Sequence, residues 1–229
     1  MLICGYQKTT LLDYPGHLAS TVFTGSCNFA CPFCHNRSLV LHPDGYIPEE
    51  EFFSFLVKRK NILTGVCISG GEPTLQPDLI SFIRKIREFD LLIKLDTNGY
   101  RPDVIEELLQ LNLLDYIAMD IKSGCSHYSL LAGIDDLDLE KIKKSISLIE
   151  HSGIAYEFRT TVVKDYHTAW DFEEISQFLS PQSPYFLQSF KDSGNILTPG
   201  LSACSSEELN AFLSLVKRRL PKASLRGGN

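Results

Sequence analysis

The chain has 229 residues, of which 44% are hydrophobic and 22% charged, and 28 acidic residues outnumber 22 Lys and Arg to give a formal net charge of -6. This composition is typical of a globular protein and excludes collagen-like, low-complexity and largely disordered chains. The acidic balance argues against a protein that binds nucleic-acid backbones. No apolar run reaches the roughly 18 residues of a membrane span, and residues 1–15 lack the apolar centre of a signal peptide. We therefore expect a cytoplasmic protein without nucleic-acid or membrane partners.

Short β-type runs alternate with longer helical patterns along the chain. Leu79, Phe82 and Ile86 recur at helical spacing, and Ser205 with Glu208 forms a capping box for a last helix. The expected strands are 20–24, 66–69, 92–95, 116–121, 156–163 and 185–190. The expected helices are 49–60, 78–89, 102–111, one carried by Leu139, Ile142, Ile146 and Ile149, 170–179, and a last one from the capping box to about residue 220.

Six strand–helix units in this order predict an α/β fold with a parallel sheet and right-handed crossovers. Eight units would complete a (β/α) barrel, so we expect a partial (β/α)6 barrel, that is, an open parallel sheet with helices outside. No linker or repeat divides the chain, which predicts one domain over 1–229 with an N-terminal extension (1–19), a (β/α) core (20–190) and a C-terminal helix region (191–229). Whether the segment up to Gly16 forms a strand or caps the barrel stays open.

Polar and glycine-rich segments lie toward the carboxyl ends of five of the expected strands. They are the loop that holds Cys27, Cys31 and Cys34, the segments 69–73 and 96–99, the pair Asp120 and Lys122, and the segment 159–161. In parallel α/β proteins, chemistry collects at the carboxyl ends of the strands. We therefore expect these segments to form one functional site.

Three of the seven cysteines fall within eight residues: Cys27, Cys31 and Cys34. Cys31 and Cys34 alone would match a thioredoxin-like dithiol, but Cys27 would then be unexplained. Cys31 to His35 matches a c-type haem attachment pattern, which requires export. Three thiolates on one loop can instead bind an iron–sulfur cluster or zinc, although His35 is awkwardly placed as a fourth zinc ligand. We interpret Cys4, Cys67, Cys125 and Cys204 as buried or incidental thiols.

The spacing Cys27-x3-Cys31-x2-Cys34, followed by Gly70-Gly71-Glu72-Pro73, resembles the radical S-adenosylmethionine superfamily. The segments 5–16 and 27–39 resemble the anaerobic ribonucleoside-triphosphate reductase activating proteins, whose pattern the pyruvate formate-lyase activators largely share. No second cysteine cluster lies between Cys34 and Gly70, so we expect one cluster.

The resemblance implies that Cys27, Cys31 and Cys34 hold three irons of a [4Fe–4S] cluster and that S-adenosylmethionine chelates the fourth. An electron from the cluster would then cleave the cofactor to methionine and a 5′-deoxyadenosyl radical. The residues expected to bind the cofactor are Gly70, Gly71, Glu72, Asp96, Asn98, Asp120, Lys122 and Arg159. The expected roles are close backbone approach for the two glycines, acceptance from the amino group for Glu72, and contacts to the ribose and carboxylate for the others.

Several of these residues also have a structural alternative. Glu72 could start a helix before Pro73, Asn98 could belong to the turn before Gly99, and Asp120, Lys122 and Arg159 could form strand-end ion pairs. Two weaker expectations are that Gln188 closes the site from the far side, and that His35 donates near the cluster or is simply exposed.

The activator resemblance implies that the substrate is a glycine in anaerobic ribonucleotide reductase, whose α-hydrogen is abstracted. No catalytic acid, base or nucleophile is required on this chain for that step, and flavodoxin or ferredoxin is the expected electron donor. The alternatives are an activator of another glycyl radical enzyme such as pyruvate formate-lyase, a radical enzyme for a small molecule, and a non-catalytic iron–sulfur or zinc module.

Overall fold

The computed structural model describes residues 1–41, 43, 45–192 and 194–227. Contacts between residues divide it into two compact units. The first unit contains residues 1–28, 38–97 and 103–118, and the second contains 29–37, 98–102 and the chain from 119 onward. The single-domain organisation expected from the sequence stays a prediction.

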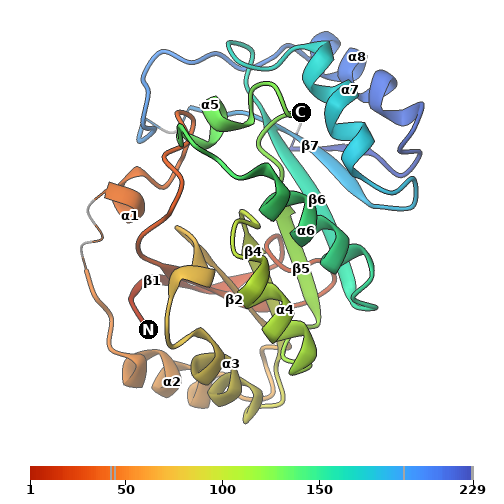
Figure 1. Ribbon diagram of the computed structural model, residues 1–229. Helices are drawn as coiled ribbons and strands as arrows, with labels where there is room; N and C mark the ends of the chain where they lie inside the picture. The colour runs from red at the N-terminus through yellow and green to blue at the C-terminus, as the bar shows by residue number, and fades with distance from the viewer. Residues whose placement is uncertain (42, 44, 193, 228–229) are drawn as a thin grey trace. The chain divides into compact units, whose positions relative to one another are not determined.

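The first unit is built on the first four strands, which are β1 (Ile3–Thr10), β2 (Ala19–Thr24), β3 (Gly65–Gly70) and β4 (Leu92–Thr97) (Figure 1). Strands β2, β3 and β4 are parallel, with Ala19 opposite Gly65 and Gly65 opposite Leu92. The N-terminal segment, whose role the sequence left open, forms β1 and pairs antiparallel with β2.

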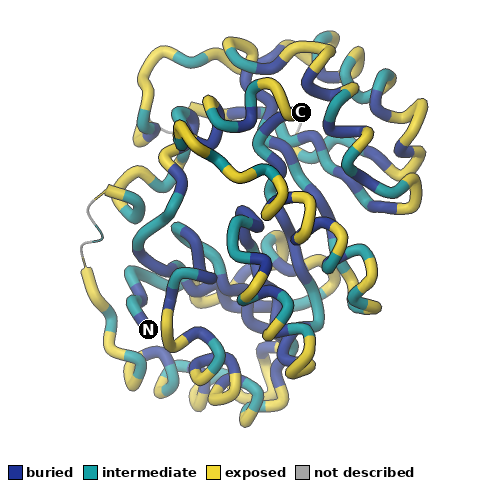
Figure 2. The backbone as a smooth tube through the Cα atoms, viewed as in Figure 1, coloured by how far each residue is buried: buried dark blue, intermediate teal, exposed yellow. Residues whose placement is uncertain are grey.

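Helices of the first unit bury apolar faces against the strands. They are α2 (Glu49–Lys58), the short 3₁₀ helix η1 (Pro73–Leu75), α3 (Leu79–Arg87) and most of α4 (Pro102–Gln110), while α1 (Arg37–Leu41) begins at the unit boundary. Phe52 of α2 and Phe82 of α3 are fully buried and stack with ring centroids 5.8 Å apart. Figure 2 shows the same pattern, with buried strands and helices whose outer sides are exposed.

The second unit holds the end of β5 (Tyr116–Asp120), which starts in the first unit, and the strands β6 (Ala155–Val162), β7 (Tyr185–Ser189) and β8 (Ser224–Arg226). Strands β6, β7 and β8 are parallel. The helices of this unit are α5 (Tyr128–Ala132), α6 (Leu139–Glu150), α7 (Ala169–Phe178) and α8 (Ser206–Lys217). The capping box expected at Ser205 and Glu208 starts α8.

The expected α/β fold with a mostly parallel, open sheet is confirmed. The strands are hydrogen-bonded in chain order from β1 to β8, and the six expected strands are β2 to β7. All six expected helices are present, with ends that differ by a few residues. The additional elements are β1, β8, α1, η1 and α5. Within the described part of the chain, no helix is long and apolar enough to cross a membrane.

Candidate functional site

Gly70 and Gly71 end β3 against the segment that leads into the cysteine motif. Gly70 has a φ of 118°, and a Cβ there would lie 2.3 Å from the backbone nitrogen of Thr24. A Cβ on Gly71 would lie 1.9 Å from the carbonyl oxygen of Ser26. The Gly71 amide donates to Thr24 (2.9 Å), and the Glu72 amide donates to Ser26 (2.9 Å). Only glycine permits this close backbone approach. The glycines therefore fix the chain directly before Cys27, and their contact with a cofactor stays a prediction.

The Glu72 carboxylate is fully buried and caps the short helix η1. One of its oxygens accepts from the backbone nitrogen of Thr74 (3.1 Å), from Thr74 Oγ1 (2.6 Å) and from Thr97 Oγ1 (2.8 Å). The structural alternative for Glu72, a helix start before Pro73, is thus confirmed. Binding of a cofactor amino group by the same carboxylate stays a prediction.

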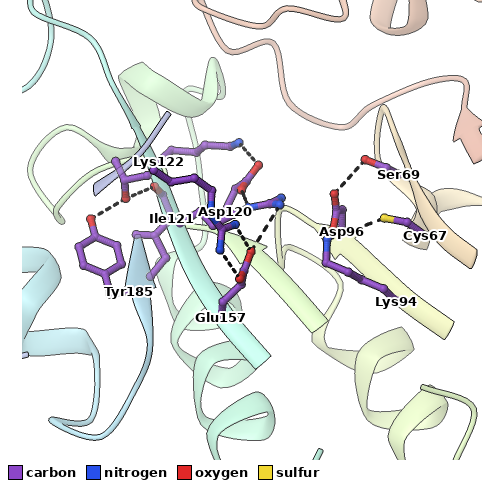
Figure 3. A network of polar contacts seen from close by, with 12 residues as sticks. Cys67, Ser69, Lys94, Asp96, Asp120, Ile121, Lys122, Glu157 and Tyr185 are labelled. Carbon is purple, nitrogen blue, oxygen red and sulfur yellow. Dashed lines mark hydrogen bonds and ion pairs between the residues drawn. The ribbon is translucent and has the colours of Figure 1, made fainter. Parts of the chain in front are cut away.

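Asp96, at the end of β4, is paired with a buried lysine that the sequence reasoning missed. Ser69 Oγ donates to Asp96 (3.2 Å), and Lys94 Nζ forms an ion pair with the same carboxylate (Figure 3). Lys94 is only 1% exposed, and its Nζ also lies 3.8 Å from Cys67 Sγ. A lysine within the apolar run of residues 92–95 was the available signal, because a buried lysine needs an anionic partner.

The cysteine loop of residues 29–37 is held by backbone hydrogen bonds within the second unit. Ala30 donates to the carbonyl of Ala132 (2.9 Å), and Pro32 accepts from Thr198 (2.8 Å). Gly133 has a φ of 68°, and a Cβ there would lie 2.4 Å from the Ala30 carbonyl oxygen. The end of α5 therefore fixes the backbone of the loop that carries Cys31 and Cys34.

All seven cysteines lie in the described chain, and none forms a disulfide there. Cys31 is buried, and burial raises the pKa of its thiol to about 11, while Lys122 acts in the opposite direction. Among the described residues, no three His, Cys, Asp or Glu side chains are already grouped at a metal-binding distance. The ligand role of Cys27, Cys31 and Cys34 therefore stays a prediction that rests on the motif and on the chemistry of three cysteines outside disulfides.

Asp120 at the end of β5, Lys122 just after it and Arg159 within β6 form a cluster. Arg159 Nε donates to Asp120 Oδ1 (2.8 Å), and Lys122 Nζ lies 3.3 Å from Asp120 Oδ2. Burial opposes the charge of Asp120, but Arg159 and Lys122 hold the pKa of its carboxyl well below the usual range. Burial likewise opposes the charge of Lys122, yet Asp120 and then Cys31 raise its pKa. The strand-end ion pairs named as the alternative are confirmed, and the cluster is fully charged at neutral pH.

The charge cluster continues to two residues that the sequence reasoning missed. Glu157 on β6 is 1% exposed and accepts from Arg226 Nη1 (2.5 Å) and Nη2 (2.7 Å). Arg159 Nη1 lies 3.8 Å from the same carboxylate. Figure 3 shows Glu157 close to Asp120. No local pattern links Glu157 with Arg226, because they are 69 positions apart.

Tyr128 of α5 carries a buried polar group without a hydrogen-bond partner among the described residues. Its hydroxyl is buried and has no hydrogen-bond partner among the described residues. Burial is the largest influence and raises the pKa of this phenol. The positive charge of Lys122 lowers this pKa, whereas the charges of Cys31 and Asp120 raise it further. A buried hydroxyl without a partner costs free energy, so its presence here fits a site that a polar cofactor completes.

Asn98, His35 and Gln188 are placed by the structure as follows, and their expected contacts near the cofactors stay predictions. Asn98 Oδ1 accepts from the backbone of Tyr100 (2.9 Å), which confirms its turn role before Gly99. His35 is exposed and stacks on Phe190. Gln188 lies on β7 opposite Arg226. Of the four scattered cysteines, Cys67 and Cys204 are buried, Cys4 is half-buried and Cys125 is exposed.

The family follows from sequence comparison. The family model described as the Radical SAM superfamily matches residues 21–179. A protein of Methanocaldococcus jannaschii that carries the name glycyl-radical enzyme activating enzyme is 35% identical over 198 residues, which cover 83% of this chain and 80% of that protein. The chain therefore belongs to the radical SAM superfamily and is a radical SAM enzyme. Members of this superfamily use a [4Fe–4S] cluster and S-adenosylmethionine, the cofactor pair expected from the motifs.

Two further similarities are informative. A protein of Saccharolobus solfataricus named as a GTP 3′,8-cyclase is 28% identical over 173 residues, which cover 72% of this chain and 54% of that relative. The crystal structure of Streptococcus suis SuiB bound to S-adenosylmethionine superposes with a TM-score of 0.67 at 15% identity, over 88% of this chain and 48% of SuiB. This likeness shows a shared fold.

Proposed function

We propose that this radical SAM enzyme generates a glycyl radical on a partner protein, and that the partner is an anaerobic ribonucleoside-triphosphate reductase. The observation that carries the proposal is the 35% identity to the M. jannaschii activating enzyme over most of both chains. The choice of this reductase rests on the resemblance of residues 5–16 and 27–39 to its activators. The cytoplasmic location expected from the sequence stays a prediction.

In this proposal, Cys27, Cys31 and Cys34 hold the [4Fe–4S] cluster. Their fit rests on donor chemistry, because three cysteine thiolates can bind three irons of a cluster and leave the fourth open to a further ligand. When bound, the cluster and S-adenosylmethionine supply reductive cleavage of the sulfonium to methionine and a 5′-deoxyadenosyl radical. The Lys122 ammonium, close enough to Cys31 to act on its pKa, offsets negative charge on the thiolates.

The remaining residues bind and orient S-adenosylmethionine. Arg159 and Lys122 supply positive charge for a carboxylate, while Asp120 and Asp96 supply acceptors for hydroxyl or amino groups. Glu72 and Asn98 line the strand ends, and Gly70 with Gly71 sets the backbone path there. No side chain of this set has to move a proton, because the reaction transfers a hydrogen atom from a glycine of the partner. Flavodoxin or ferredoxin is the proposed electron donor.

The test uses the full chain, reconstituted with iron and sulfide without oxygen and mixed with a reductant, S-adenosylmethionine and the candidate reductase. We expect an electron paramagnetic resonance signal of a glycyl radical on the reductase. Cys31→Ala should abolish the signal, whereas Cys125→Ala, which removes an exposed thiol outside the motif, should retain it. Cofactor cleavage without a radical on any candidate partner would contradict the proposal.

A radical enzyme for a small molecule is the second candidate. It is favoured by the 28% identity to the GTP 3′,8-cyclase of S. solfataricus. Consumption of GTP or another metabolite by the reconstituted chain alone, in the absence of a partner protein, would support this candidate.

A further inference from the structure

Arg226, three residues before the end of the chain, closes a row of alternating charges. The row runs from Arg226 on β8 through Glu157 and Arg159 on β6 to Asp120 and Lys122 at the end of β5 (Figure 3). Adjacent members lie 2.5 to 3.8 Å apart between charged atoms. The sequence therefore brings its last strand into the cluster assigned above to cofactor binding.

Arg226 is held in place by two independent contacts. Its guanidinium donates twice to Glu157, at 2.5 and 2.7 Å, and it stacks over the ring of Phe186 at 3.8 Å. A bidentate pair fixes both the position and the plane of a guanidinium, which a single contact does not. The buried Glu157 carboxylate is thus neutralised from the β8 side.

Arg159 lies between two carboxylates that compete for it. Its Nε donates to Asp120 at 2.8 Å, whereas its Nη1 is 3.8 Å from Glu157, outside hydrogen-bond distance. Loss of Arg226 would take the bidentate partner away from the buried Glu157 carboxylate and so strengthen its attraction for other cations. Arg159 is a cation that already lies 3.8 Å from this carboxylate, and its movement toward Glu157 would remove it from Asp120.

We propose that Arg226 is a positioning residue for the cofactor site: by neutralising Glu157, it keeps Arg159 on Asp120. This inference rests on the proposed role of Asp120, Lys122 and Arg159 in binding S-adenosylmethionine. Arg226 of the C-terminal strand thereby acts on Asp120 through Glu157 and Arg159.

The test measures the Kd of S-adenosylmethionine for the reconstituted full chain by anaerobic equilibrium dialysis. The second readout is the change that the cofactor causes in the electron paramagnetic resonance spectrum of the reduced cluster. R226Q should raise the Kd about tenfold, the size expected for one misplaced charged hydrogen bond. R226K keeps the positive charge but cannot form the two parallel hydrogen bonds of a guanidinium, so its Kd should lie between those of R226Q and the natural chain. Lys164→Met, which removes an exposed ion pair with Glu208 in the same unit, is the matched control.

The double variant R226Q/E157Q separates a positioning effect of Arg226 on Arg159 from a general loss of structure. Without the Glu157 charge, nothing draws Arg159 away from Asp120, so the double variant should recover the Kd of E157Q alone. A Kd for R226Q equal to that of the natural chain would overturn the inference, as would a double variant no better than R226Q. If R226Q fails to fold, the same comparison between R226K and R226K/E157Q decides the matter.

Asp120→Asn distinguishes this inference from the proposed function on which it rests. If D120N binds S-adenosylmethionine as the natural chain does, the assigned cofactor site is wrong. If D120N weakens binding while R226Q does not, the site stands and the role of Arg226 is wrong.

Discussion

The ammonium of Lys94 is buried beside Asp96, two residues further along the same strand, and the two side chains form an ion pair. Lys94 also stands opposite Cys67 of the neighbouring strand, whose Sγ lies 3.8 Å from its Nζ. The Asp96 side chain, an expected ribose contact, is therefore held by a buried lysine of the same strand.

Replacing Lys94 by Met should destabilise the protein by about 3 kcal/mol, because it removes the buried cation of an ion pair and takes from Asp96 one of its partners. Chemical denaturation of the natural chain and the variant measures this difference. Lys85→Met is the matched control, since Lys85 forms an ion pair with Glu49 but is 53% exposed, and it should leave the free energy of unfolding almost unchanged. Equal effects of both substitutions would contradict a special role for Lys94.

A methyl group on Gly71 should disturb the chain before Cys27. Its Cβ would lie 1.9 Å from the backbone of Ser26, so the backbone itself must shift. We expect Gly71→Ala to lower the free energy of unfolding by more than about 2 kcal/mol and to reduce the iron bound per chain after reconstitution. Gly5→Ala, where nothing lies within 4 Å of the added Cβ, is the control for both measurements. Full iron content in Gly71→Ala would show that the contact with Ser26 does not matter for the motif.

Tyr128→Phe should act oppositely on the protein without and with its cofactors. Because the Tyr128 hydroxyl is buried without a partner among the described residues, its removal should leave the cofactor-free protein as stable or about 1 kcal/mol more stable. Binding of the cluster and S-adenosylmethionine should raise the melting temperature less in this variant than in the natural chain. Tyr185→Phe is the matched comparison, because the hydroxyl of Tyr185 donates to Thr160 at 2.7 Å and its loss should destabilise both forms.

The carboxyl group of Asp171 should make the stability of the protein depend on pH. It is fully buried, and burial alone would raise the pKa of its carboxyl. Hydrogen bonds from Thr168 and Ser123 and the nearby His127 instead hold that pKa below its ordinary value of 3.8. Because the pKa of Asp171 is lower in the folded than in the unfolded chain, its carboxylate stabilises the folded protein. This stabilisation is complete above the unfolded pKa and is lost as the pH falls through the folded pKa.

Asp171→Asn should therefore cost about 2 kcal/mol at pH 7, and the gap to the natural chain should narrow below about pH 4. Denaturation curves of both proteins between pH 7 and pH 3 measure the gap. A gap that stays constant over this range would show that the Asp171 charge does not contribute.

The sequence predicted the parts of the molecule that depend on local periodicity. Strands β2 to β7 and the main helices follow from apolar spacing and from signals such as the Ser205–Glu208 capping box. Strand β8 has only three residues and helix α5 only five, too short for a period to be recognised.

Side-chain partners were predictable only where the partners are close in the chain. The pair Asp120 and Lys122 follows from alternation along one strand. Glu157 and Arg226 come together because β6, β7 and β8 are neighbours in the sheet, and the orphan hydroxyl of Tyr128 depends on how α5 is buried. Such relationships require the tertiary structure.

The most direct test of the central claim is to count iron and sulfide in the reconstituted protein and to assay 5′-deoxyadenosine after addition of dithionite and S-adenosylmethionine without oxygen. We predict about four irons per chain and formation of 5′-deoxyadenosine, both lost in Cys31→Ala and kept in Cys125→Ala. Bound zinc, or a reduced cluster that never cleaves S-adenosylmethionine, would contradict the account.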